Sequence, residues 1–154
     1  RQRQMCIRDR PQVVGIKECS WEVARYDANR RLVRQAAPHV AVMASGDEHL
    51  LTSFVLGTEG SIVSLAALIP DVVVALYEAV QHGDLKAAQA AHEIIYPLAR
   101  VIYGRNPASH ATARLKTSLN LIGNLESDRV RLPLGQLGAD EIKTLQEALH
   151  QARL

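Results

Sequence analysis

Residues 13–18 read Val-Val-Gly-Ile-Lys-Glu, and this short stretch decides the fold. Val13 to Ile16 is apolar and β-branched, follows Pro11, and therefore predicts a strand that is covered on both faces. Side chains alternate across a strand, so Gly15 and Lys17 share one face, with the lysine at the C-terminal end. Inside a closed sheet, apolar walls around that amine favour its neutral, nucleophilic form. The alternative is a lysine that extends from the strand end into solvent.

Strand and helix signals alternate from Pro11 onward, which is the pattern of a parallel α/β fold. Ser20 is the predicted N-cap of a helix that ends near Pro38, and a second strand follows at Val40 to Ala44. The next predicted features are a turn at 45–47, a helix from Glu48 to Leu56 that ends at Gly57, and a third strand from Gly60 to Leu65. Three strand–helix units in about 70 residues match the spacing of a (β/α)8 barrel.

After Pro70 the sequence predicts helices alone. They are a helix over 72–81 capped by Asp71 and ended by Gly83, a longer helix from Asp84 toward Tyr103 with a kink or break at Pro97, and two more over Ser109–Ile122 and Asp140–Arg153. Three strands do not close a barrel, so we expect about five further strand–helix units to precede this chain in a complete one. The chain then divides into a barrel part, 11–82, and a helical domain, 83–154.

The composition is that of a globular protein. Hydrophobic residues make up 47% and charged residues 22% of the 154 residues, close to average usage. No apolar run approaches the roughly 18 residues that span a bilayer, so we expect no membrane association. The formal charge is +2, and it comes from arginines before Pro11. The remaining body is nearly neutral, which argues against nucleic acid as a partner.

Residues 1–10, RQRQMCIRDR, show no hydrophobic period and are interpreted as a non-native leader rather than a basic binding arm. Cys6 and Cys19 form no CxxC pair and no secretory signal is recognisable, which predicts a cytoplasmic protein. The histidines form neither an HxH nor an HExxH pair, so no metal is expected. The remaining polar candidates are interpreted as structural: Asp71, Asp84 and Asp140 as helix caps, and Tyr77, Tyr96 and Tyr103 as packing residues.

Several sequence blocks resemble one enzyme family from its sixth barrel strand onward. The blocks are GIKECS (15–20), SGDEHLL (45–51), GTEGSIVSLAALIP (57–70), a helix ending in HGD (82–84), LKTSLNLIG (115–123) and RLPLGQL (131–137). In this order and spacing they resemble the C-terminal half of the dihydrodipicolinate synthase and N-acetylneuraminate lyase family of class I aldolases. The resemblance covers Pro11 to Leu154.

The resemblance implies roles for five residues. Lys17 would form an imine with pyruvate or another 2-oxo acid, Gly46 would line the pocket, and the carbonyl of Ile62 would lie near the substrate. In the lyase branch, Glu48 and Ser64 would hold a sugar chain; otherwise they are a surface carboxylate and a buried strand serine. The family's proton-relaying tyrosine, threonine pair and carboxylate-binding groups belong to earlier strands, so we expect this chain alone to be inactive.

The sequence therefore predicts part of a pyruvate-dependent, 4-hydroxy-tetrahydrodipicolinate synthase-like lyase that acts through a lysine Schiff base. The resemblance further implies a small-molecule substrate, no cofactor and a homotetramer at full length. Three alternatives remain open: an inactive or regulatory barrel fragment, a 2-keto-3-deoxy sugar acid aldolase or N-acetylneuraminate lyase, and a barrel isomerase or decarboxylase whose lysine is a general base. The second substrate is left undetermined.

Overall fold

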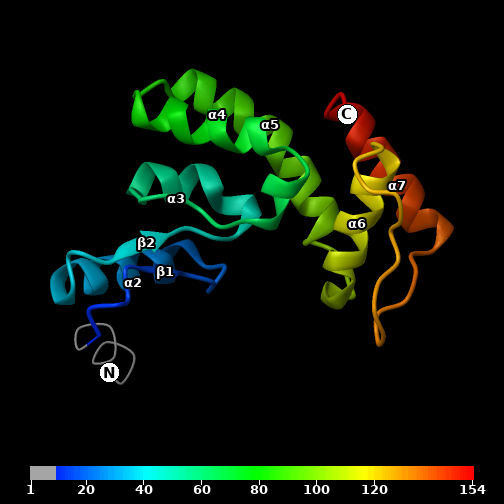
Figure 1. Cartoon of the computed structure of the whole chain (residues 1–154). Coiled ribbons are helices and arrows are strands. Elements are labelled where there is room, and N and C mark those ends of the chain that lie inside the picture. The colour runs from blue at the N-terminus through cyan, green and yellow to red at the C-terminus, as the bar shows by residue number, and fades with distance from the viewer. Residues whose placement is uncertain (1–9) are drawn as a thin grey trace.

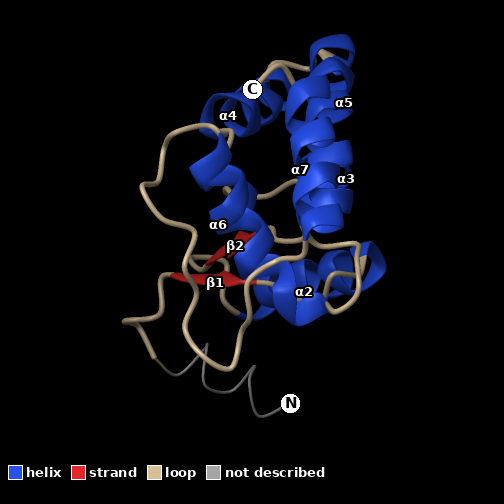
Figure 2. Cartoon of the chain, turned by 90° about the vertical axis from the view of Figure 1, so that its right-hand side faces the viewer, coloured by secondary structure: helices blue, strands red, loops and turns tan. Residues whose placement is uncertain are grey.

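The computed structural model describes residues 10–154 (Figure 1). The interpretation of residues 1–10 as a leader therefore falls almost wholly outside the described residues. In chain order, the elements are β1 (Gly15–Lys17), α2 (Val23–Ala36), β2 (Ala41–Met43), η1 (Asp47–His49), α3 (Leu50–Leu56), η2 (Ser64–Ala67), α4 (Pro70–Gln81), α5 (Leu85–Ile102), η3 (Ala108–His110), α6 (Ala111–Leu121) and α7 (Ala139–Gln151). Figure 2 shows the two short strands together near α2, with helices making up most of the fold.

The two strands are parallel, as the sequence predicts. Lys17 lies opposite Met43, and the amide of Glu18 continues the ladder by donating to the Met43 carbonyl at 3.0 Å. The first strand begins two residues later than predicted, because Val13 belongs to a turn in which its amide bonds to the carbonyl of Arg10. The prediction that Ser20 caps the next helix is wrong. Its hydroxyl bonds to the Glu18 carboxylate at 2.9 Å, and the helix begins at Val23.

The predicted third strand from Gly60 to Leu65 is reduced to a single parallel bridge between Ser61 and Ala44. Beyond this bridge the chain forms η2, because a side chain from the turn after β2 binds a backbone amide there. The buried Asp47 carboxylate accepts a hydrogen bond from the Leu65 amide at 2.9 Å, so that amide is directed toward a side chain and not toward a neighbouring strand. The structure is therefore α/β with a two-stranded sheet in its described part.

The helices after Pro70 follow the prediction closely, with corrections at their ends. Pro70 occupies the first position of α4 and α7 follows Gly138, so Asp71 and Asp140 lie in first turns and are not caps. In those positions they still interact favourably with the helix dipole. Asp84 does cap α5 by accepting from the Ala87 amide at 2.9 Å. The helix continues through Pro97, where the sequence had predicted a kink or break.

The helices form one continuous core. α4 packs along α5, and α5 also contacts η1, α3, α6 and α7, so it joins the strand-bearing part to the C-terminal helices (Figure 1). Arg114 of α6 is 1% exposed in this core. Its guanidinium donates to the carbonyls of Ile102, Arg105, Asn106 and Pro107 at 3.0–3.3 Å and to the carboxylate of Glu141 at 2.9 Å.

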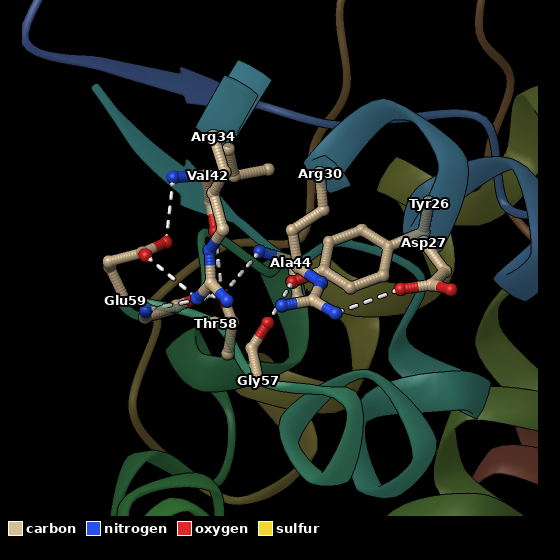
Figure 3. Close-up of polar contacts among 10 residues, drawn as sticks. Tyr26, Asp27, Arg30, Arg34, Val42, Ala44, Gly57, Thr58 and Glu59 are labelled. Carbon is tan, nitrogen blue, oxygen red and sulfur yellow. Dashed lines mark hydrogen bonds and ion pairs between the residues drawn. The ribbon is translucent and has the colours of Figure 1, made fainter. Parts of the chain in front are cut away.

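Side chains complete the hydrogen bonds of β2 on the edge away from β1 (Figure 3). The Thr58 hydroxyl lies 2.8 Å from the carbonyl of Val42 and accepts from the amide of Ala44 at 3.2 Å. The Glu59 carboxylate accepts from the Val42 amide at 2.8 Å and from Arg34 of α2 at 3.1 Å. Burial by itself raises the pKa of Glu59, but these two partners outweigh it and hold the pKa below its ordinary value. A side-chain pair thus takes the place of strand pairing at this point of the sheet.

Replacing Thr58 with valine tests this edge. The change keeps the shape of the side chain but leaves the polar groups of β2 without their hydroxyl partner, so we expect the free energy of unfolding to fall by about 1–3 kcal/mol. Urea unfolding measures it. Thr52→Val on the exposed side of α3 is the matched control and should change stability by no more than about 0.5 kcal/mol. Equal effects at the two positions would contradict the edge role of Thr58.

Replacing Arg114 with methionine tests the anchor of the C-terminal helices. Because the change leaves four carbonyls and the Glu141 carboxylate without their donor, we expect a loss of about 3 kcal/mol in unfolding free energy. The expected loss is at the lower end of the range for removing one partner of a buried ion pair, because 26% of the Glu141 side chain is exposed. Arg105→Met, which removes one exposed hydrogen bond to Thr144, is the control. A loss below about 1 kcal/mol for Arg114→Met would contradict the anchoring role.

Candidate functional site

Lys17 lies at the C-terminal end of β1, where the prediction placed it. Its side chain is exposed, so the described residues do not enclose the amine in the apolar walls that the sequence argument expected. The neighbouring strand position is Met43, and the chain after β2 continues directly into the turn at 44–47. An apolar enclosure of the Lys17 side chain would therefore need residues other than those of β1 and β2.

The loop that follows Lys17 is braced by Glu18. The Glu18 carboxylate accepts from the Ser20 amide at 3.2 Å, from the Ser20 hydroxyl at 2.9 Å and from the Asn29 amide group at 2.9 Å. The Ser45 hydroxyl donates to the carbonyl of Glu18. These contacts tie the loop to α2 and to the end of β2, so the backbone next to the lysine is fixed from two sides.

Gly46 and Asp47 form the turn at the end of β2. Gly46 is buried with a φ of +87°, a left-handed conformation that favours glycine. Asp47 is 3% exposed, and burial raises its pKa even though the Leu65 amide and the charge of Lys17 act in the opposite direction. The sequence argument assigned Asp47 only to a turn and missed its hydrogen bond with the Leu65 amide.

Three predicted residues lie around the same turn. Glu48 follows Asp47 and is half-buried, and its Oε2 atom is fully buried with no hydrogen-bond partner among residues 10–154. Ile62 is 50% exposed and donates its amide to the Ala44 carbonyl at 3.2 Å. Ser64 begins η2 and is exposed, so the expectation of a buried strand serine is wrong.

Tyr103, at the end of α5, lies against the loop that follows Lys17. It is the C-cap residue of α5, and its ring meets Trp21 edge-on with 5.5 Å between ring centroids. The Tyr103 hydroxyl is buried. Burial raises the Tyr103 pKa to about 12, the charges of Asp47 and Glu48 act in the same direction, and the nearby Ser64 hydroxyl lowers it. The interpretation of Tyr103 as a packing residue is therefore incomplete.

The other candidates from the sequence stay apart from this site. Tyr77 packs edge-on against Phe54, and Tyr96 is exposed beside His92. Among residues 10–154, no cluster of three or more histidine, cysteine or acidic side chains has the arrangement to hold a metal ion. In the same part of the chain, no helix is both long and apolar enough to cross a membrane.

Comparison with known proteins identifies one family. The model of the dihydrodipicolinate synthetase family matches residues 5–152. The 4-hydroxy-tetrahydrodipicolinate synthase of Thermodesulfovibrio yellowstonii is 28% identical over 149 residues, which are 96% of this chain and 48% of that protein. The chain spans about half the length of the curated relatives it matches.

Solved structures agree with this match. A monomeric variant of dihydrodipicolinate synthase superposes with a TM-score of 0.86 at 25% identity, over 98% of this chain and 49% of that one. YagE of Escherichia coli K12, a prophage protein of the dihydrodipicolinic acid synthase family, was solved in complex with pyruvate. It superposes with a TM-score of 0.86 at 26% identity, over 98% of this chain and 50% of that one.

Replacing each of two glycines beside the site with alanine should change the stability to different extents. Gly46→Ala forces a side chain into the left-handed region, so we expect a loss of about 1–2 kcal/mol in the free energy of urea unfolding. Gly15→Ala is the control, because the added Cβ would meet Ala41 at an ordinary 3.6 Å and the backbone is not strained. If Gly46→Ala is as stable as Gly15→Ala, the left-handed turn does not constrain the site.

Proposed function

Because this chain belongs to the dihydrodipicolinate synthetase family, we propose that it supplies the imine-forming lysine of a pyruvate-dependent lyase, and that this lysine is Lys17. The observation that carries the proposal is the position of Lys17 at the C-terminal end of a parallel strand, beside the turn that holds Gly46. In barrel enzymes the catalytic groups lie at this end of the strands. The complex of YagE with pyruvate supports a 2-oxo acid as the first substrate.

The proposed parent fold is a (β/α)8 barrel to which 11–82 contribute strands 6–8, followed by the helical domain 83–154. Two parallel strands and the Ser61 bridge, which follow one another in sequence order, support this arrangement. The edge of β1 away from β2 has no strand beside it within the described residues. Parallel sheets are normally covered on both faces, so a complementary barrel half would be expected against this edge.

The proposed chemistry begins with the neutral amine of Lys17. It attacks the ketone carbon of pyruvate, the resulting carbinolamine loses its hydroxyl as water, and a carbon–nitrogen double bond forms. The imine then accepts the electron pair that remains when a proton leaves the adjacent methyl carbon, and this enamine adds to the carbonyl carbon of an aldehyde. Water finally hydrolyses the imine and releases the lysine. Cleavage of the product is the reverse sequence, and neither direction requires a metal or a bound cofactor.

The other site residues take supporting roles in this proposal. The buried Gly46 turn would leave backbone next to the substrate, and the bond from the Ile62 amide to the Ala44 carbonyl holds the Ile62 segment beside β2. Glu48 and Ser64 would contact the second substrate in the sugar-acid branch. Cys19 is a free cysteine, which fits the proposed cytoplasmic location. A homotetramer is proposed for the full-length protein.

The second candidate is an inactive or regulatory barrel part that forms no imine even within a longer polypeptide. The observation that favours it is the exposure of Lys17, because the described residues leave its side chain in water and not in an apolar pocket. The two candidates differ for a longer polypeptide that carries this chain, because the first predicts a pyruvate adduct on Lys17 there and the second predicts none. A lysine that acts as a general base would differ from the first candidate, since it forms no covalent adduct with pyruvate.

Borohydride trapping with pyruvate distinguishes these candidates. Reduction converts the imine into a stable amine, so we expect intact mass and peptide mapping to find one pyruvate-derived adduct on Lys17 in the longer polypeptide. We expect little or none in the 154-residue chain by itself. Lys17→Ala should abolish the adduct, whereas Lys86→Ala, at an exposed lysine of α5, should keep it. An unlabelled Lys17 in the longer polypeptide would refute the imine mechanism.

A further inference from the structure

The loop between β1 and α2, residues 18–22, has a conformation that a free loop would not keep. Trp21 has a φ of +61°, in the left-handed region that a bulky side chain rarely adopts. Such a conformation costs free energy and persists only where surrounding contacts enforce it. A Cβ added at Gly46 would lie 3.9 Å from the Cα of Trp21, so the loop packs directly against the turn after β2. The loop follows Lys17, and its contacts therefore also fix the backbone that carries the lysine.

The side chain of Glu18 supplies the hydrogen bonds that hold this loop. Its carboxylate accepts from the amide of Ser20 at 3.2 Å and from the Ser20 hydroxyl at 2.9 Å, which closes the loop on itself. It also accepts from the side-chain amide of Asn29 at 2.9 Å. Asn29 lies in the middle of α2, so the carboxylate is fixed to a helix as well as to its own loop.

The backbone of Glu18 is held by the neighbouring strand. Its amide donates to the carbonyl of Met43 at 3.0 Å, and its carbonyl accepts from the hydroxyl of Ser45. The first of these bonds involves the peptide group that Glu18 shares with Lys17. The backbone after the lysine is therefore fixed by β2 on one side and by α2, through the Glu18 carboxylate, on the other.

The Glu18 carboxylate acts from the face of the strand opposite to the lysine. Side chains alternate along a strand, so Glu18 is directed toward α2, where Asn29 binds it, and Lys17 is directed to the other face. A carboxylate paired with the lysine would favour the ammonium form, which is not a nucleophile. Neutral donors bind this carboxylate instead, so its effect on Lys17 passes through the backbone.

We propose that Glu18 is a positioning residue that fixes the direction in which the Lys17 amine leaves the sheet, and that Asn29 holds the Glu18 carboxylate in place for this purpose. The inference rests on the proposed function of Lys17 for the reaction, whereas the hydrogen bonds that carry it belong to the described chain. A lysine side chain is long and flexible, so a backbone that also moved would spread the amine over many positions. A fixed backbone keeps the amine near the bound ketone and raises the rate of attack.

The rate of imine formation tests this role in the longer polypeptide. Rapid quenching with borohydride at several pyruvate concentrations, followed by intact mass, gives a maximal rate, a half-saturating concentration and a final amplitude. Glu18→Ala should lower the maximal rate about tenfold and Asn29→Ala about threefold, with the other two quantities unchanged. A merely structural role would lower the amplitude instead, because unfolded molecules do not react. Alanine is a better helix former than asparagine, so a slower Asn29→Ala does not result from a weaker α2.

The coupling between the two residues provides a second criterion. Because Asn29 acts only through Glu18, the double variant should react no more slowly than Glu18→Ala alone. Glu22→Ala, at an exposed carboxylate of the same loop, and Gln35→Ala, at an exposed amide of α2, are the matched controls and should react like the wild type. A wild-type rate in Glu18→Ala, or a double variant slowed by the product of the two single effects, would overturn the proposal.

Amide hydrogen exchange of the 154-residue chain tests the same contacts without any reaction. The Glu18 amide, which is bonded to Met43, should exchange about fivefold faster in Asn29→Ala, the equivalent of one net hydrogen bond, and at the wild-type rate in Gln35→Ala. Equal exchange in all three proteins would overturn the positioning role. An unlabelled Lys17 in the wild-type longer polypeptide would refute the imine mechanism, and the exchange rates would still decide whether Asn29 and Glu18 fix this backbone.

Discussion

The parallel pairing of β1 with β2 fixes where every residue of the candidate site lies. Because Lys17 is opposite Met43, the turn that follows β2 comes to the same edge of the sheet as the lysine. Gly46 permits the sharp change of direction there, and Asp47 is buried at the point where the next segment must pass. A shift of register by one residue would move the lysine to the opposite face and separate it from the turn.

The two edges of this small sheet differ in how their backbone groups are satisfied. On the side of β2, the hydroxyl of Thr58 and the carboxylate of Glu59 bind the free amides and carbonyls, and Ser61 adds one backbone bridge. The other edge, along β1, has no strand beside it among the described residues. This asymmetry is the physical argument for a partner segment on the β1 side.

Local sequence patterns predicted the features that depend on local interactions. The two strands, the end of α3 at Gly57, the cap at Asp84 and the four long C-terminal helices were all predicted from apolar spacing and capping residues. The third strand was wrong because the Asp47 carboxylate, eighteen positions away, binds the Leu65 amide. The contact between the Tyr103 and Trp21 rings was missed for the same reason, since helical spacing explains why Tyr103 is partly buried but not which distant residue it meets. The role of Lys17 rested on a family resemblance, because composition alone favours a lysine in solvent.

The C-terminal helices have a physical connection to the site. Arg114 binds the carbonyls of Ile102, Arg105, Asn106 and Pro107, and these residues surround Tyr103 in sequence. Glu141 of α7 holds the guanidinium from the other side, and its own pKa is kept low by that contact although burial opposes it. The position of the Tyr103 ring against Trp21 is therefore set by a buried ion pair in the helical part. α6 and α7 therefore support the segment that carries Tyr103, and through it the contact with Trp21 in the loop after β1.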